Sequence, residues 1–335
     1  MEANLTNGIC KQVNFNFTQV FIPTVYVNVF VFGLVGNCFG LKSVHDNWAK
    51  LGNTNIFVLN LCVADILYLF TLPFLLDYYV KDQTWNFGDV FCKTTRFLFS
   101  INLYGSIGFL TCISVYRYLG IVHPLRVKGR IRPHYSIGIT ALVWILVSVQ
   151  SLPDVFFEKS YANKKACFDT TGDTSIDSYL TYSITRAVTG FAVPLLIMVC
   201  CYGHVAVTLF NKKDSGDAML KLRCLRLVMI LALLFSICFI PFHIFRNLNL
   251  QTRVWKKKLF CRGWYANIYV ANQISHGLVC LNSAINPLVY LFSSDERLRW
   301  CFRCVKVQPS SHLTKFTFVY SPRGRNASVE LLSTP

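Results

Sequence analysis

The sequence carries little charge for its length. Only 15% of its 335 residues are charged, and 16 Asp and Glu stand against 33 Lys and Arg. Soluble globular domains carry about 25% charged residues, so this composition argues against a cytosolic fold. A disordered chain is excluded as well, because 53% of the residues are hydrophobic.

Short sequence periods are also absent. The apolar residues show no heptad stripe, no collagen-type repeat and no ten-residue alternation typical of a transmembrane barrel. They fall in long blocks, and a helix of about 20 mostly apolar residues spans a hydrocarbon core of about 30 Å. Seven blocks qualify: Phe21–Val44, Asn55–Val80, Phe91–Val122, Ser136–Phe157, Leu180–Phe210, Cys224–Asn247 and Trp264–Phe292. We therefore predict an all-α membrane protein, a seven-transmembrane helix bundle.

Basic residues predict how the bundle crosses the membrane. With the N-terminus outside, Lys and Arg gather in inner loops at 126–132 and 212–226 and in the tail. Sequons at Asn4 and Asn16 precede the first block, and their glycosylation requires an extracellular N-terminus. We expect a multi-pass plasma-membrane protein with a cytoplasmic C-terminus. Residues 1–20 lack a cationic n-region and an apolar h-region, so the first span is expected to act as the signal anchor.

These signals divide the chain into four parts: an extracellular glycosylated N-terminus (1–20), the bundle (21–292), a short cytoplasmic amphipathic helix on the membrane surface (293–304) and a cytoplasmic tail (305–335). Cys301 and Cys304 in the amphipathic segment are candidates for palmitoylation. Four cysteines lie on the side predicted to be extracellular, where disulfides persist: Cys10, Cys92, Cys167 and Cys261. The sequence alone leaves their three pairings open.

Polar residues and prolines interrupt the blocks in a fixed order: Asn37, Asp65, Tyr116-Arg117-Tyr118, Trp144, Pro194, Tyr202, Pro241 and Asn286-Pro287-Leu288-Val289-Tyr290. Together they resemble the rhodopsin-like (class A) G protein-coupled receptors, over residues from about 20 to 305. The resemblance implies a heterotrimeric G protein as partner, with Arg117, Tyr202 and Tyr290 at the coupling side. It also implies arrestin and receptor kinases acting at the tail.

Asp65 is a lone carboxylate near the middle of the second block. Such a group is costly in the membrane and is a candidate for function by default. With Asn282 and Asn286 it resembles the sodium-and-water site of these receptors, which implies an allosteric sodium ion and no other cofactor or metal. The alternative is a purely structural cluster of hydrogen bonds.

Two positions depart from the receptor pattern. Tyr116 stands where an acidic residue usually precedes the arginine, and Phe239 stands where many receptors carry a tryptophan. The resemblance implies that the usual acid–arginine lock is absent. We therefore expect the inactive state to be held less firmly.

A second set of basic and titratable residues lies in the half of the bundle predicted to face outward: Arg96, Arg186, His243, Arg246 and His276. Residues 246–262 add further Lys and Arg without any Asp or Glu. A guanidinium inside a span needs a partner or a wet cavity. Asp77 and Asp169 are the nearest acids and are too few, so we expect an anion from solution, although snorkelling of these side chains to the surface is the alternative.

Three segments sharpen the resemblance: Arg96-Phe97-Leu98-Phe99, Cys167-Phe168-Asp169-Thr170-Thr171 and His243-Ile244-Phe245-Arg246. They resemble the metabotropic purinergic nucleotide receptor family. The resemblance implies disulfides Cys92–Cys167 and Cys10–Cys261, and signalling through phospholipase C and calcium. It implies an extracellular nucleotide bound by Arg96, Tyr104, Arg186, His243, Arg246, Gln273 and His276. One departure is Gln273-Ile274-Ser275-His276, where the family carries Gln-x-x-Arg.

Other functions receive less support. A receptor for a dicarboxylate or another anionic metabolite would use a similar arginine pocket. An anion transporter would be expected to show internal repeats, and none is present. An enzyme is not expected, because neither H-E-x-x-H nor a nucleophile elbow occurs. The net charge of +17 divides between two membrane faces, so no nucleic acid polymer is expected as partner.

Overall fold

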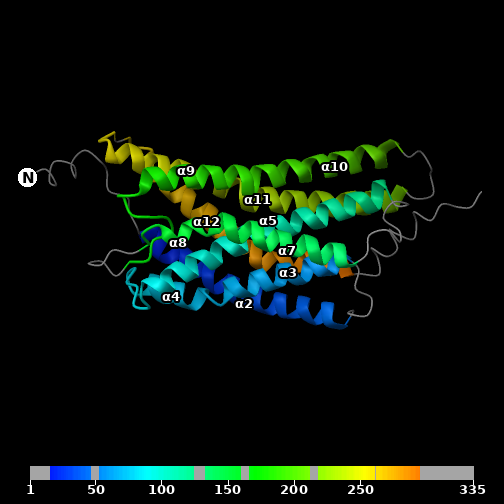
Figure 1. The fold of residues 1–335 in the computed structure, drawn as a ribbon, viewed down its shortest axis with the longest axis horizontal. Helices are drawn as coiled ribbons and strands as arrows, with labels where there is room; N and C mark the ends of the chain where they lie inside the picture. Colours follow the sequence, from blue (N-terminus) through cyan, green and yellow to red (C-terminus); the bar gives the residue numbers. More distant parts are fainter. Residues whose placement is uncertain are drawn as a thin grey trace, which may run out of the picture. The chain divides into compact units, whose positions relative to one another are not determined.

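The computed structural model describes residues 16–46, 53–123, 133–159, 166–211, 218–260 and 262–294, and every regular element within them is helical (Figure 1). The elements are α2 (Asn16–Asp46), α3 (Asn53–Leu69), α4 (Leu72–Val80), α5 (Asp89–Val122), α7 (Pro133–Ser151), α8 (Pro153–Phe156), α9 (Ile176–Ala187), η2 (Val188–Ala192), α10 (Val193–Asn211), α11 (Ala218–Lys257) and α12 (Tyr265–Ser294). The all-helical prediction is confirmed for these ranges.

Six helical segments are long and apolar enough to cross a membrane: 17–42, 53–80, 89–122, 133–156, 176–208 and 232–257. They coincide with the first six predicted blocks. The seventh block forms α12, whose polar residues lower its mean hydropathy. These polar residues include His276 and Asn286, which are also the residues predicted from the sequence to have functional roles.

Proline explains where the predicted spans are broken into shorter helices. The second block is divided between α3 and α4, and α4 has Pro73 in its first turn. The fourth block ends α7 at Ser151, and Pro153 begins α8. Proline has no N–H to donate and clashes with the preceding turn, so the hydrogen-bond ladder is interrupted at these points.

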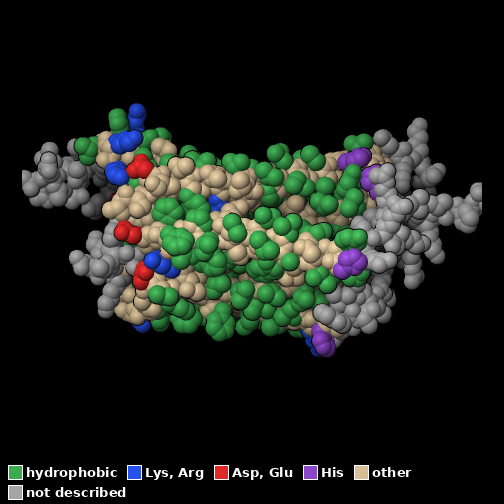
Figure 2. Space-filling model, viewed as in Figure 1, with side chains coloured by type: hydrophobic (Ala, Val, Ile, Leu, Met, Phe, Trp, Pro, Cys, Tyr) green, Lys and Arg blue, Asp and Glu red, His purple; other side chains and the backbone are tan. Residues whose placement is uncertain are grey.

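Helix α5 lies at the centre of the packing. It contacts α3, α7, α10 and η2, while α12 packs against α2, α3 and α11. Figure 2 shows that hydrophobic side chains cover the middle of the visible face, whereas Lys, Arg, Asp and Glu gather mostly at the end drawn on the left. Apolar residues around the middle suit a lipid environment, because the bilayer core offers no partner to a polar group.

Several predicted features lie outside the described residues. These are Asn4, Cys10, Cys261, Cys301, Cys304, the segment after residue 294 and the basic loop residues 126–132. Asn16 begins α2 and Tyr290 lies within α12, but their side chains are not described. Glycosylation, palmitoylation, the amphipathic helix and the tail therefore stay predictions.

Candidate anion site at the disulfide end

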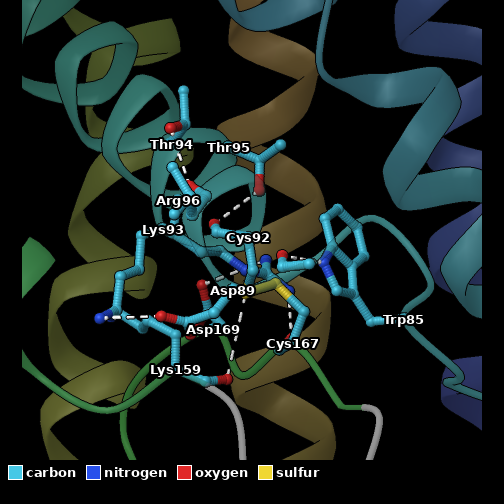
Figure 3. Close-up of a disulfide and its surroundings, with 12 residues drawn as sticks. Trp85, Asp89, Cys92, Lys93, Thr94, Thr95, Arg96, Lys159, Cys167 and Asp169 are labelled. Carbon is cyan, nitrogen blue, oxygen red and sulfur yellow. Dashed lines mark hydrogen bonds and ion pairs between the residues drawn. A yellow bond between two sulfur atoms is a disulfide. The ribbon is translucent and has the colours of Figure 1, made fainter.

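A disulfide joins Cys92 in the first turn of α5 to Cys167, with 5.7 Å between the two Cα atoms. This confirms one of the two predicted bridges. We call this end of the bundle the disulfide end. Figure 3 shows that the bridge holds the segment containing Cys167 and Asp169 against the start of α5, close to Arg96.

Two arginines from different helices converge on one carboxylate. Nη1 of Arg96, on α5, lies 3.7 Å from Asp169, and its Nη2 donates to the carbonyl oxygen of Cys167 at 2.8 Å. Nη1 of Arg246, on α11, donates to the other oxygen of Asp169 at 2.9 Å. Both guanidinium groups are buried. Asp169 therefore lies between them, and two positive charges share one negative charge.

The electrostatics of Asp169 follow from this arrangement. Burial raises the pKa of its carboxyl, but the positive charge of Arg246 outweighs this and holds the pKa well below its usual range. Asp169 therefore remains ionised at physiological pH. Of the two acids expected near the arginines, it is the one that pairs with them, since Asp77 pairs instead with Lys81 at 2.8 Å.

The remaining predicted pocket residues surround this pair. His276 on α12 is buried and lies 3.3 Å from the Tyr26 hydroxyl, with its ring 4.9 Å from that of Phe99. His243 on α11 stacks on Phe191 at 4.3 Å and lies 5.8 Å from the ring of Tyr104. Gln273 is half-buried, one turn before His276. The chain thus brings these side chains to the same end of the bundle as Arg96 and Arg246.

Arg186 on α9 is buried but has neutral partners. Its Nη1 donates to Ser100 at 3.1 Å and to the Tyr182 hydroxyl at 3.3 Å. Its guanidinium lies over the ring of Tyr104. None of the three arginines is more than 4% exposed, so the snorkelling alternative is wrong for Arg96, Arg186 and Arg246.

The basic end of α11 does find acidic partners, although its own sequence contains none. Arg253 pairs with Asp173 at 2.6 Å, and Lys257 pairs with Asp177 at 3.0 Å. These contacts also explain why α11 continues ten residues beyond the predicted end of the sixth block. Most of the charge in residues 246–257 is therefore neutralised by acids that lie about 80 residues earlier.

A buried chain of contacts behind Arg246 was missed from the sequence. Nη2 of Arg246 donates to the Tyr179 hydroxyl at 2.9 Å, and that hydroxyl donates to Asp154 at 2.9 Å. Asp154 also pairs with buried Lys159 at 2.9 Å. A carboxylate directly after Pro153, at the end of an apolar block, was the signal that could have indicated it.

Comparison with known proteins supplies the family. The model of the "7 transmembrane receptor (rhodopsin family)" matches residues 36–290. The Y-type purinoceptor 1 of Gallus gallus is 36% identical over 301 residues, which are 89% of this chain and 83% of the relative. The chain belongs to the Y-type purinoceptors.

Two further relatives agree with this assignment. The Y-type purinoceptor 1 of Homo sapiens is 36% identical over 89% of this chain and 80% of its own length. The Y-type purinoceptor 4 of Mus musculus is 37% identical over 87% of this chain and 80% of its own length. The chain is thus a multi-pass plasma-membrane G protein-coupled receptor and not an enzyme, as the sequence predicted.

The receptor also contains the polar cluster predicted around Asp65. The Asp65 carboxylate accepts hydrogen bonds from Nδ2 of Asn286 at 2.9 Å and from Nδ2 of Asn102 at 2.8 Å. Asn102 was missed from the sequence, and Asn282 is buried one turn before Asn286. Ser106, one turn after Asn102, has a buried hydroxyl that makes no hydrogen bond in the described part of the receptor.

At the opposite end of α5, Arg117 is buried and its Nη2 has no hydrogen-bond partner among the described residues. The neighbouring Tyr116 points elsewhere and accepts a hydrogen bond from Asn53 at 3.3 Å. Tyr202, on α10, contacts the hydroxyl of Ser114. Tyr116 thus supplies no counter-charge to Arg117.

The shared carboxylate leads to a testable prediction. Replacing Asp169 by Asn (Asp169→Asn) leaves two buried guanidinium groups without an anion, and such a loss typically costs about 3–5 kcal/mol, less here because Asp169 is partly exposed. We expect a lower thermal midpoint in detergent. Inorganic pyrophosphate should then raise the midpoint more than in the wild type, since it stabilises the folded state by binding.

The matched control is Asp77→Asn, which removes the exposed pair with Lys81. It should change neither the midpoint nor the response to pyrophosphate, because exposed pairs contribute about 0–1 kcal/mol. Equal behaviour of Asp169→Asn and Asp77→Asn would show that Asp169 does not serve as the anion of the two arginines.

Proposed function

We propose that this receptor binds an extracellular nucleotide and in response activates a heterotrimeric G protein. The observation that carries the proposal is the convergence of Arg96 and Arg246 on the single carboxylate of Asp169. Two buried guanidinium groups with one carboxylate retain an excess positive charge. Arginine presents a planar fork suited to phosphate oxygens, so a phosphate chain could replace Asp169 and bind both.

The remaining pocket residues receive roles under this proposal. Tyr104 and His243 would shape the cavity beside Arg246, and Gln273 and His276 would line the wall formed by α12. The names of the relatives, Y-type purinoceptors 1 and 4, support a purine or related nucleotide as ligand. His276 weakens the cationic character of the α12 wall, where the family resemblance led us to expect an arginine.

The orientation belongs to the proposal as well. We infer an extracellular N-terminus with glycans at Asn4 and Asn16, and a cytoplasmic tail that binds arrestin and receptor kinases. The disulfide end, with its anion site, would then face outward. A second bridge between Cys10 and Cys261 would restrain the N-terminus over the site.

Signalling follows if the nucleotide binds one arrangement of the helices more tightly than the other, because a ligand shifts an equilibrium only by its difference in affinity. We infer phospholipase C and calcium as the output. Asp65 with Ser106 and the neighbouring amides offers oxygen ligands suitable for an allosteric sodium ion. Bound sodium would compete with the amide donors that now occupy the Asp65 oxygens.

A screen of transfected cells tests the function. Calcium and cAMP would be measured during exposure to adenosine and uridine nucleotides and to organic dicarboxylates. A calcium response to a nucleotide supports the proposal. A response to dicarboxylates alone would make the receptor one for anionic metabolites, a second candidate that His276 favours because it leaves one cation fewer on α12.

The third candidate, an anion transporter, has a separate test. Anion flux into vesicles that contain the purified receptor should equal that of empty vesicles. Flux that depends on Arg96 and Arg246 would favour transport over signalling.

Coupling to the G protein gives a further prediction, at the Arg117 end. Arg117→Ala should preserve surface expression and reduce the stimulated signal, because it removes the cation expected to engage the G protein. Tyr116→Asp should lower any ligand-independent signal, since a carboxylate there would supply the lock that Tyr116 cannot form. Unchanged basal and stimulated signals in both variants, at matched surface expression, would rule out this account of coupling.

A further inference from the structure

Four basic side chains at the disulfide end are almost fully buried: Arg96, Lys159, Arg186 and Arg246. Three of them pair with a carboxylate, namely Arg96 and Arg246 with Asp169, and Lys159 with Asp154. Arg186 forms no ion pair with any carboxylate in the part of the receptor that the structure describes. It therefore lacks the counter-charge that its buried neighbours have.

The neutral contacts of Arg186 do not replace a counter-charge. It donates to two hydroxyl groups, lies 5.0 Å and 4.9 Å above the rings of Tyr104 and Tyr182, and leaves its Nε without a partner. A cation–π contact contributes about 0.5–2 kcal/mol. Removing an ion from water costs several kcal/mol. An anion beside Arg186 would compensate this cost.

Two further buried nitrogen atoms without partners lie in the same region, Nε2 of Gln150 and Nε2 of His243. Tyr104 connects them to Arg186. Its ring lies 5.8 Å from the ring of His243. A methyl group placed on Gly190 would lie 2.2 Å from Nε2 of Gln150 and 2.6 Å from the Tyr104 ring, so both side chains crowd the same backbone position.

The local backbone suits a site at this position. Arg186 lies in the last turn of α9, and the π-helix η2 begins two residues later. π-helical turns are rare and frequently occur at functional sites. Here the turn carries Gly190 against Gln150 and Tyr104, and it carries Phe191 onto the ring of His243 at 4.3 Å. A glycine is required for this approach.

We propose that Arg186, Gln150 and His243 form a second anion subsite, separate from the site of Arg96, Asp169 and Arg246. It takes one compact anionic group, which is either the terminal phosphoryl group of the agonist or a chloride ion from solution. Arg186 supplies the charge, and the amide of Gln150 supplies a neutral donor. The agonist-borne case rests on the proposed nucleotide function, whereas the chloride case does not.

The first arm of the test uses no nucleotide. Thermal unfolding of the detergent-solubilised receptor is followed in chloride and in gluconate at equal ionic strength, because gluconate is too large for a compact site. If chloride is the occupant, the wild type is more stable in chloride, and this difference is lost in Arg186→Gln. The matched control Lys257→Gln removes an exposed pair with Asp177 and should keep the difference.

The second arm compares adenosine and uridine mono-, di- and triphosphates in the calcium assay. If the agonist supplies the anion, the wild type prefers one phosphate chain length by about tenfold or more, equivalent to about 1.4 kcal/mol. Arg186→Gln should abolish this preference while Lys257→Gln retains it. The shortest active nucleotide should keep its potency in Arg186→Gln, since Arg96 and Arg246 are intact.

Either arm supports the subsite and identifies the source of its anion. The absence of a chloride effect, together with an unchanged ranking of chain lengths in Arg186→Gln, would overturn it and leave Arg186 as a structural residue. If Arg186→Gln does not reach the surface, the uncharged change Gln150→Leu decides by the same two readouts. If no nucleotide activates the wild type, the proposed function fails, and the chloride arm alone decides on the subsite.

Discussion

Arg96→Ala and Arg246→Ala should each weaken the agonist by about thirty-fold or more at normal surface expression. Losing one partner of a desolvated charge pair costs about 2–5 kcal/mol, and each 1.4 kcal/mol is about a tenfold change in affinity. Each replacement also leaves Asp169 to pair more fully with the remaining arginine. The measurement is the concentration dependence of the calcium signal together with radioligand affinity.

The two positions should differ in their response to conservative changes. Arg246 uses Nη1 for Asp169 and Nη2 for Tyr179, so Arg246→Lys loses one of two directed contacts. Arg96 uses Nη2 for the Cys167 carbonyl, and Arg96→Lys would also loosen the segment held by the disulfide. Lysine offers a single ammonium group and cannot reproduce the planar fork. We therefore expect both lysine variants to lie between the wild type and the alanine variants.

The matched control for the arginines is Lys257→Ala, which removes an exposed cation at the same end of the bundle. Exposed pairs contribute about 0–1 kcal/mol and are screened by salt, so its effect should be small and should fade at high ionic strength. If both pocket arginines could be replaced without loss of potency, the anion site would be wrong. A loss confined to dicarboxylates would retain the site and change the ligand.

The helices and the receptor family could be predicted because their signals are local in the sequence. A block of apolar residues indicates a span by itself, and residues such as Asp65, Arg117 and Pro287 interrupt these blocks in a recognisable order. The limits of the helices were harder to predict. The polar extension of α11 depends on Asp173 and Asp177, which belong to a different part of the chain.

The site could be predicted only in part, for the same reason. Composition and depth indicated that Arg96 and Arg246 needed an anion, but their sharing of Asp169 depends on contacts across 73 and 77 residues. The partner of Asp65 on α5, Asn102, is 37 residues away and has no sequence pattern of its own. Helix packing decides such contacts, and hydropathy does not record it.

The second large effect concerns the buried pair behind Arg246. Lys159→Met should lower the thermal midpoint in detergent strongly, because it leaves the carboxylate of Asp154 buried without its cation. Removing one partner of a buried pair typically costs about 3–5 kcal/mol. Agonist affinity should fall as well, since Asp154 positions Tyr179, and Tyr179 contacts Arg246.

A double variant separates the pair from its surroundings. Lys159→Met combined with Asp154→Leu removes both charges, and such a replacement is often nearly neutral for stability. The double variant should therefore recover most of the thermal midpoint without recovering agonist affinity. Lys81→Met, which breaks an exposed pair with Asp77, serves as the control and should have little effect. A double variant as unstable as Lys159→Met would show that packing, and not the buried charge, causes the loss.

Stability should also depend on pH through Lys159. Burial lowers the pKa of this lysine to about 8, although Asp154 favours its charged form. An unfolded chain keeps the lysine protonated to about pH 10.4. Between these values the unfolded state binds more protons than the folded state, so stability rises with pH over this interval. The difference in thermal midpoint between the wild type and Lys159→Met should therefore widen from about pH 8 to about pH 10. A difference that narrows would mean that Asp154 holds the pKa of Lys159 above its unfolded value, and that burial is the weaker influence on this lysine.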